Sequence, residues 1–469
     1  MSARYLTTTL PYVNADPHIG FALEAVQADV LARVWRAAGD EVFFSMGTDE
    51  HGQKILEAAQ KAGQEPQAYV DHYAAEFHKL KDALNLTNDR FIRTTDPEHL
   101  EAAQEMWRRC AAKGDVYKKT YTGLYCVGCE AFKTEKELVD GTCPLHPNGE
   151  LTEVSEENYF FRFSKYEKEL LAYLERPEVL IPEWRRIEAI NFVKGGLEDF
   201  SISREASRAS WGIPVPDDDS QVMYVWFDAL TNYISTLGWP EDTEGNFKKF
   251  WEEGTTLQIA GKDQLRFQSL MWQAMLMSAE IKNTDSVFYH GFITSGGAKM
   301  SKSIGNVINP LDLVEQYGTD AVRYLLLRHV SPVEDSDLTL EAIHDHYTAH
   351  LTNGLGNLVA RVMQLAETYL QNPVSADAAT PEPIVGFKFN EAMDAMWARI
   401  SAADLRITAE RPFVVVKENP EEGKRVITEL VQELYRIGAS LRPYMPATAE
   451  KILQAVQENK KPENLFPRL

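Results

Sequence analysis

The chain has 469 residues, enough for two to four domains, and its 44% hydrophobic and 25% charged residues predict folded cores rather than a disordered chain. No apolar run is long enough to span a bilayer, the N-terminus lacks a secretory pattern, and four cysteines argue for a reducing cytoplasm, so we expect neither a membrane protein nor a disulfide-rich secreted one. The net charge of −22 disfavours general attraction to phosphates, and a nucleic-acid partner would need local basic patches.

The first strand-to-helix turn is a candidate ligand site. Residues 4–10 alternate as a strand does, the loop-forming segment 11–17 breaks that pattern, and apolar residues between 19 and 34 recur at helical spacing. His18 and Gly20 therefore lie at the carboxyl edge of a predicted parallel sheet, where ligands bind. A helix N-terminus attracts phosphate, and glycine allows its close approach. Taken alone, a His-x-Gly tripeptide is most often structurally incidental.

The chain as far as residue 110 alternates strands and helices, which predicts a parallel sheet covered by helices. We expect a buried strand at 41–48, followed by helices at 52–62 and 99–114. Asp49 directly follows the buried strand. It could bind a ligand at the sheet edge or merely cap the next helix.

Four residues have the spacing of a zinc site. Cys126 and Cys129 form one ligand pair, Cys143 and His146 form a second, and 13 residues lie between the two pairs. Four protein ligands leave no position for a catalytic water, so the predicted Zn²⁺ is structural. Cys110 lies outside this pattern and is expected in the core.

The second half resumes the α/β pattern and then changes to helices. We predict strands at 222–229, 256–263 and 286–294, a helix at 265–279, and a glycine hinge at 295–297. The basic stretch KMSKS at 299–303 follows this hinge, as either a lid for a triphosphate or an ordinary exposed loop. After a linker at 330–337, helical periodicity at 344–370, 390–407, 426–441 and 447–457 predicts a helix bundle.

Two of these segments, RYLTTTLPYVNADPHIG at 4–20 and KMSKS within HGFITSGGAKMSKSIGNVI, together resemble the paired signatures of class I aminoacyl-tRNA synthetases. Their flanking residues, with EENYFFRFSKY at 156–166, narrow the resemblance to the methionyl-tRNA synthetase family over nearly the whole chain. It implies a Rossmann-type catalytic domain at 1–115 and 223–335. A connective insertion occupies 116–222, with its zinc knuckle at 126–146, and an α-helical anticodon-binding domain occupies 336–469. The insertion leaves no room for the editing domain of related synthetases.

The resemblance implies a two-step reaction. The carboxylate of L-methionine attacks the α-phosphate of ATP, which yields methionyl-adenylate and pyrophosphate, and the methionyl group then passes to the 3′ end of its tRNA. Catalysis falls to His18, Gly20, Lys299 and Lys302, and Mg²⁺ accompanies the ATP. By the same resemblance, ATP is bound by Asn14, His18, Gly20, Gly261, Asp263 and Lys302.

The resemblance also implies an amino-acid pocket and an anticodon-reading face. The pocket comprises Leu10, Tyr12, Asp49, Trp226, Ala229, Tyr233, Gln268 and Trp272. Asp49 suits the substrate ammonium, and aromatic rings suit a thioether, although an aromatic core cluster would have the same composition. The anticodon face comprises Asn357, Arg361 and Phe413, which could equally be ordinary surface residues.

Three positions depart from the family pattern. Phe21 replaces the second histidine of the first signature, Gln268 replaces a common histidine of the pocket, and Phe413 replaces the tryptophan expected to stack on the anticodon. These changes put one ATP contact and one methionine contact in doubt and remove an N–H donor from the anticodon face.

Two other readings stay open. A cysteinyl-tRNA synthetase would need an open zinc position for its substrate thiol, and a non-catalytic tRNA-binding relative would be expected to lack His18 or Lys302. Because the chain lacks the C-terminal dimerisation domain common in the family, we expect a monomer.

Overall fold

The structure is a computed structural model that describes residues 2–126, 131–133, 138–144, 149, 151–300, 306–375, 384 and 386–469, with the backbone alone at 121, 131, 132, 154 and 299. It divides into two compact units. Unit 1 comprises 1–17, 41–79 and 88–289, and unit 2 comprises 18–40, 80–87 and 290–469. Within the described part of the chain, no helix combines the length and apolar character needed to cross a membrane.

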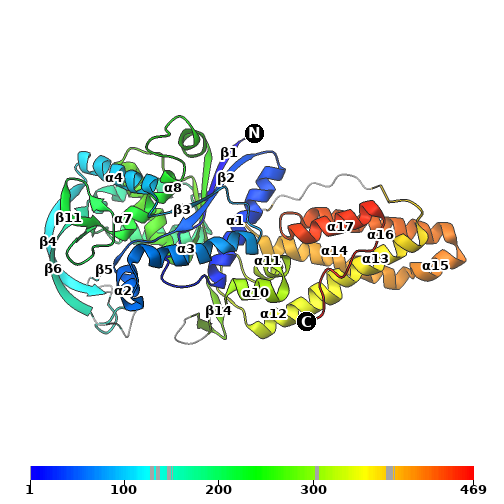
Figure 1. Cartoon of the computed structure of the whole chain (residues 1–469). Coiled ribbons are helices and arrows are strands. Elements are labelled where there is room, and N and C mark those ends of the chain that lie inside the picture. The colour runs from blue at the N-terminus through cyan, green and yellow to red at the C-terminus, as the bar shows by residue number, and fades with distance from the viewer. Residues whose placement is uncertain are drawn as a thin grey trace. The chain divides into compact units, whose positions relative to one another are not determined.

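Unit 1 is built on the predicted parallel sheet (Figure 1). Its strands, in spatial order, are β3 (Arg90–Arg93), β2 (Glu41–Thr48), β1 (Ala3–Thr7), β12 (Thr255–Gly261), β13 (Ser286–His290) and β7 (Leu180–Ile181). The pairings of β3 with β2, β2 with β1, β1 with β12, and β13 with β7 are parallel. The strand order reverses at β1 and β12, so ligands are expected at the carboxyl ends of these two strands.

Helices and a second sheet also belong to unit 1. The helices are α2 (Gln53–Ala62), α3 (Pro66–Ala83, which continues into unit 2), α4 (Pro97–Ala112), α5 (Glu167–Leu174), α6 (Glu183–Lys194), α7 (Val225–Leu230), α8 (Asn232–Ser235) and α9 (Trp272–Ser278). In the second sheet, β4 (Val116–Cys126) pairs antiparallel with β5 (Ala131–Lys133) and β6 (Leu151–Phe161), and β6 pairs with β8 (Phe200–Ser201). Cys110 is buried in the core of unit 1, as predicted.

The prediction of a parallel strand at 222–229 is wrong. β11 (Asp218–Met223) belongs to a small antiparallel sheet with β9 (Ser203–Glu205) and β10 (Pro214–Val215), and the chain then enters α7. The Tyr224 carbonyl accepts hydrogen bonds from the backbone N–H groups of Phe227 (2.9 Å) and Asp228 (3.3 Å). The aromatic residues favour a strand locally, but the side chain of Asp228 is bound to buried histidines, and this tertiary contact prevails.

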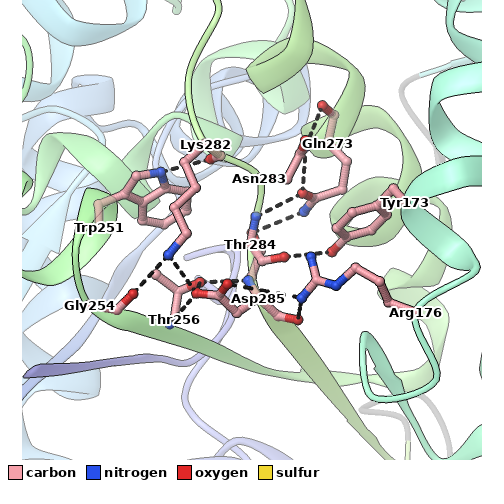
Figure 2. Close-up of polar contacts among 10 residues, drawn as sticks. All are labelled: Tyr173, Arg176, Trp251, Gly254, Thr256, Gln273, Lys282, Asn283, Thr284 and Asp285. Carbon is pink, nitrogen blue, oxygen red and sulfur yellow. Dashed lines mark hydrogen bonds and ion pairs between the residues drawn. The ribbon is translucent and has the colours of Figure 1, made fainter. Parts of the chain in front are cut away.

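The connection from α9 to β13 fixes the start of β12 (Figure 2). Asp285 Oδ2 accepts hydrogen bonds from the Thr256 N–H (2.9 Å) and from Lys282 Nζ (2.7 Å). Gln273 Oε1 accepts one from the Thr284 N–H (3.0 Å). These polar contacts hold the start of β12 in place. Gly261 is the last residue of the same strand, and Asp263 follows it.

The predicted strand at 286–294 is interrupted. β13 ends at His290, and β14 (Ile293–Ser295) joins a different sheet with β15 (Ala298–Lys299) and β16 (Ser336–Asp337). A Cβ at Gly291 would lie 2.2 Å from the Glu334 carbonyl oxygen, so the backbones cross where only glycine fits. Gly296 and Gly297, at φ +66° and +75°, form the turn between β14 and β15.

Unit 2 contains a bundle of helices (Figure 1). The unit begins with α1 (Ile19–Ala37), which confirms the predicted first helix. Its other helices are α10 (Pro310–Tyr317), α11 (Thr319–Arg328), α12 (Leu340–His346), the π-helical segment η7 (Tyr347–Gly356), α13 (Asn357–Tyr369), α14 (Phe389–Glu410), α15 (Pro412–Glu418), α16 (Pro420–Leu441) and α17 (Pro446–Glu458). The helical character predicted after residue 336 is confirmed, apart from the short β16.

Candidate active site

The carboxyl ends of β1, β2 and β12 carry much of the predicted small-molecule site in unit 1. Beyond β1, the segment containing Leu10, Tyr12 and Asn14 lies beside the end of β2, because the Asp49 N–H donates to the Pro11 carbonyl (2.9 Å) and the Val13 N–H donates to the Asp49 carbonyl (3.1 Å). Tyr12 and Asp49 are therefore brought together, and Asp49 is buried. Asn14 is exposed.

Neighbouring contacts fix the backbone at Asp49. Glu50, fully buried, accepts a two-pronged ion pair from Arg93, with Nε to Oε1 at 2.7 Å and Nη2 to Oε2 at 2.8 Å. Thr48 and Thr95 donate hydroxyl hydrogen bonds to the same carboxylate. Such paired contacts restrict direction as well as distance, so the end of β2 is held rigidly.

Three residues of the predicted pocket, Tyr233, Gln268 and Trp272, form one buried cluster. Gln268 Nε2 donates to the Tyr233 hydroxyl (2.8 Å), and the rings of Tyr233 and Trp272 lie 5.9 Å apart between centroids. Among the described residues, neither Gln268 Oε1 nor Trp272 Nε1 has a hydrogen-bond partner, although both atoms are buried. A buried acceptor and a buried donor that lack protein partners can bind a polar ligand or water.

Trp226 and Ala229 lie on α7 and are half-buried. The Trp226 ring packs edge-on against Phe267, at 3.9 Å between centroids, and against Tyr224, at 5.0 Å. This apolar, polarisable surface belongs to the same unit as the Tyr233 cluster, which fits a pocket for a sulfur-containing side chain.

A buried carboxylate with two histidines is a feature that the sequence did not indicate. Asp228 binds His51 Nδ1 through Oδ2 (2.9 Å) and His99 Nε2 through Oδ1 (3.3 Å). Burial on its own would raise the pKa of Asp228, but the two histidines hold it below its ordinary value. The three residues are far apart in the chain, and no spacing signal could have found them.

His18 and Gly20 begin α1 in unit 2. His18 Nδ1 accepts a hydrogen bond from the Gly20 N–H (3.1 Å), so His18 is the N-cap of this helix. In the neutral ring the proton then resides on Nε2, which becomes a donor. A Cβ on Gly20 would lie 2.8 Å from His18 Cε1, so any larger residue would displace the imidazole. The Phe21 ring packs against the His18 ring at 4.3 Å between centroids, with the two planes tilted by 30°.

The remaining nucleotide-binding candidates differ in exposure and in how far the structure describes them. Gly261 ends β12 and is buried, whereas Asp263 lies exposed in the following 3-10 turn. Lys299 lies in β15, described by its backbone alone, and Lys302 is outside the described residues.

Two of the four predicted zinc ligands are described. Cys126 ends β4, and Cys143 follows a tight turn in which Val139 and Thr142 exchange two backbone hydrogen bonds of 3.0 Å. Both cysteine side chains are buried. Cys129 and His146 lie outside the described residues.

The predicted anticodon residues lie in the helical part of unit 2. Asn357 and Arg361 are one turn apart on α13, whose buried face contains Leu358 and Val362. Asn357 is exposed, and Arg361 makes an ion pair with Asp404. Phe413 on α15 has 42% of its surface exposed.

Comparison with known protein families assigns the chain to a class of enzymes. The family model described as tRNA synthetases class I (M) matches residues 4–150 and 146–363. Individual relatives identify the amino acid that the family charges. The chain is 39% identical to the methionine–tRNA ligase of Fusobacterium nucleatum, over 98% of this chain and 75% of the relative, and 40% identical to that of Rhizobium meliloti, over 96% and 91%.

A solved structure agrees with these relatives. Mycobacterium tuberculosis methionyl-tRNA synthetase in complex with methionyl-adenylate superposes with a TM-score of 0.89 at 38% identity, over 98% of this chain and 94% of that one. The chain belongs to the methionine–tRNA ligase family of class I tRNA synthetases, which confirms the resemblance seen in its sequence.

Proposed function

We propose that this chain activates L-methionine with ATP to methionyl-adenylate, releases pyrophosphate, and transfers the methionyl group to the 3′ end of methionine tRNA. Its relatives of nearly equal extent are methionine–tRNA ligases, and one solved relative holds methionyl-adenylate. A chain with this task would work in the cytoplasm, where its tRNA is used.

The observation that carries this proposal is the cluster around Gln268 in unit 1. Its aromatic rings suit a polarisable thioether, and the buried Gln268 Oε1 and Trp272 Nε1 suit the polar groups of an amino acid. Asp49 would bind the substrate ammonium, with Leu10, Tyr12, Trp226, Ala229 and Tyr233 completing the pocket. A long unbranched pocket rejects β-branched amino acids by shape, so it needs no editing domain.

The ATP would be held by backbone and side-chain donors. His18 would present Nε2–H to a phosphate, Gly20 would keep the helix N-terminus open, and Asn14 would add its amide. Asp263 would accept hydrogen bonds from the ATP ribose, and Gly261 would line the ATP site. Lys299 and Lys302 would stabilise the charge that develops on the phosphates, together with a Mg²⁺ ion that accompanies ATP.

The knuckle residues would hold one structural Zn²⁺. Two buried cysteines at the end of β4 and after a tight turn fit a thiolate site, which Cys129 and His146 would complete. We predict that purified protein contains one zinc at this site and that Cys126→Ser/Cys143→Ser loses it, as measured by metal analysis. Equal zinc in the variant would contradict the assignment.

Asn357, Arg361 and Phe413 would read the anticodon. Single-stranded loops are recognised by hydrogen bonds to splayed bases and by aromatic stacking, and these residues supply an amide, a guanidinium and an exposed ring.

The deciding experiment is ATP–pyrophosphate exchange with methionine, cysteine and leucine in parallel. We expect exchange with methionine and little with the other two. Exchange driven by cysteine would favour a cysteinyl-tRNA synthetase, and no exchange with any amino acid would favour a non-catalytic tRNA-binding relative.

A further inference from the structure

Three imidazole rings, none of them assigned a role above, stack against one another in unit 2. His329 follows α11, His346 ends α12, and His350 lies in η7. The His329 ring lies 3.6 Å from that of His346 and 5.3 Å from that of His350, between centroids, and the planes are within 9° of parallel. One ring nitrogen of each lies within 4.8 Å of one from each of the others.

The positions on the helix bring these rings together. Because α12 continues directly into η7, His346 and His350 lie four residues apart on one helical face. A pair of histidines at this spacing is a common metal-binding arrangement. Long π-helical segments are rare and are frequently found at functional sites. Within the part of the chain that the structure describes, no other group of three His, Cys, Asp or Glu side chains lies close enough to share a metal ion.

One hydroxyl orients two of the rings. The Tyr324 hydroxyl lies 2.9 Å from His329 Nε2 and 2.8 Å from His350 Nδ1, and it accepts a hydrogen bond from Arg328 Nη1 (2.8 Å). These contacts engage one nitrogen on each of the two rings. The other nitrogen of each ring, His329 Nδ1 or His350 Nε2, is not bound by this hydroxyl. A hydrogen bond to the non-ligating nitrogen is the usual way in which proteins orient a metal-binding histidine.

Burial disfavours the charged form of all three rings. Burial, reinforced by the charges of His346 and Arg328, lowers the pKa of His329 to about 3. Burial followed by the Arg328 charge also lowers the pKa of His346 and of His350. A neutral imidazole keeps the lone pair that a metal needs.

The charges around the cluster do not forbid a cation. Arg328 is the cation that faces it, and its Nε donates to Asp394 Oδ1 on α14 (2.8 Å). Asp345 on α12 adds a second carboxylate to the surroundings. Asp394 thus offsets part of the positive charge of Arg328, and Asp345 favours positive charge at His346.

We propose that His329, His346 and His350 form a second metal site, which binds a divalent transition-metal ion such as Zn²⁺ through three imidazole nitrogens. Imidazole suits Zn²⁺, and three protein ligands leave a fourth position for water. A metal lies in the plane of each ring that binds it, so at least one ring must tilt out of the present stack. The ion would link the end of α11 to α12 and η7 and stabilise unit 2.

The test uses the full-length protein, stripped of metal and then dialysed against Zn²⁺ alone. We expect His346→Ala/His350→Ala to bind one Zn²⁺ per chain fewer than the wild type. His344→Ala removes an exposed histidine from the same helix and is the matched control, which should bind as the wild type does. Equal zinc in the wild type and in the double variant would overturn the proposal.

The same comparison in a Cys126→Ser/Cys143→Ser background separates this site from the predicted knuckle. There the chain with all three histidines should retain one Zn²⁺, and Co²⁺ bound in its place should give visible absorption without a thiolate-to-metal band. No cobalt binding in this background would contradict the proposal, whatever the outcome at the knuckle or in the exchange assay.

A third variant keeps the test decisive if the double variant fails to fold. Tyr324→Phe retains all three histidines and removes only the hydroxyl that orients His329 and His350. We expect Zn²⁺ affinity to fall about tenfold, as is typical when an outer partner of a metal ligand is lost. An unchanged affinity would contradict the site as described.

Discussion

The amino-acid pocket of unit 1 and the α13–α15 surface of unit 2 differ in how their residues are held. Gln268 and Trp272 have at most 1% of their surface exposed and pack on their neighbours, whereas Phe413 is 42% exposed and Asn357 faces solvent. A buried side chain is constrained by everything it touches, so changing it alters both fold and ligand binding. An exposed one can change with little effect on the fold. We therefore expect amino-acid choice and tRNA choice to be separable by mutation.

The largest effect is expected at Lys302, which serves a chemical step that both regions require. Lys302→Ala should lower the exchange rate about 100-fold or more and change the methionine KM little, because a cation used mainly in the transition state affects kcat. Exchange kinetics measure both quantities, and Lys302→Arg, which keeps the charge, is the control. A variant that loses only methionine affinity would place Lys302 in the amino-acid pocket instead.

Asp228→Asn tests the buried framework behind the pocket. Removing one partner from a buried ionic cluster typically costs about 3 kcal/mol, and we expect a loss of that order in urea unfolding at pH 7. Asp219→Asn, at an exposed position, should lose almost nothing.

The same variant has a pH signature. Burial opposes the charged form of Asp228, but His51 and His99 hold its pKa below the ordinary value. A depressed pKa stabilises the fold above about pH 4, the range of an unfolded Asp, and that contribution is lost as the pH falls through the lower folded value. The difference between wild type and variant should therefore shrink below about pH 4. If the difference in unfolding free energy between wild type and variant instead increases as the pH falls below about 4, the Asp228 pKa is not depressed by the two histidines.

Gln268→Ala tests the amino-acid pocket of unit 1. The change removes the hydrogen bond to the buried Tyr233 hydroxyl and the buried Oε1 acceptor. We expect the methionine KM in exchange to rise about tenfold, the effect of losing roughly one buried hydrogen bond. Gln67→Ala, at an exposed position of α3, should leave the methionine KM unchanged. An unaltered KM in Gln268→Ala would remove Gln268 from the pocket.

Arg361→Ala gives the smallest expected effect, on the side of unit 2. Charging of methionine tRNA should fall about fivefold, in the range of one exposed polar contact, whereas adenylate formation needs no anticodon and should stay unchanged. Arg425→Ala removes another ion-paired arginine, one that is exposed, and is the control. The variant should also discriminate less against a tRNA with its first anticodon base replaced. Intact discrimination would exclude Arg361 as a reader.

The sequence predicted elements that depend on local pattern and missed those that depend on packing. The alternation before residue 8 and the helical spacing after Ile19 were enough for β1 and α1, because each pattern matches one regular structure. The run at 222–229 looked like a strand for the same reason and was wrong, since contacts from distant histidines to Asp228 decide its conformation.

The sites follow the same division. Cys126 and Cys143 were identified by spacing along the chain, and His18 by its motif. The members of the Asp228 cluster come from separate elements and have no such spacing. Among the three stacked imidazoles, only His346 and His350 are four residues apart, and His329 joins them in the folded chain alone.

The most direct test of the account measures exchange and tRNA charging side by side for Gln268→Ala and Arg361→Ala. We predict that Gln268→Ala raises the methionine KM in both assays and leaves the tRNA KM unchanged. Arg361→Ala should raise the tRNA KM and leave exchange unchanged. If both variants alter both substrates alike, the assignment of methionine to the pocket of unit 1 and of the anticodon to the α13 surface of unit 2 is wrong.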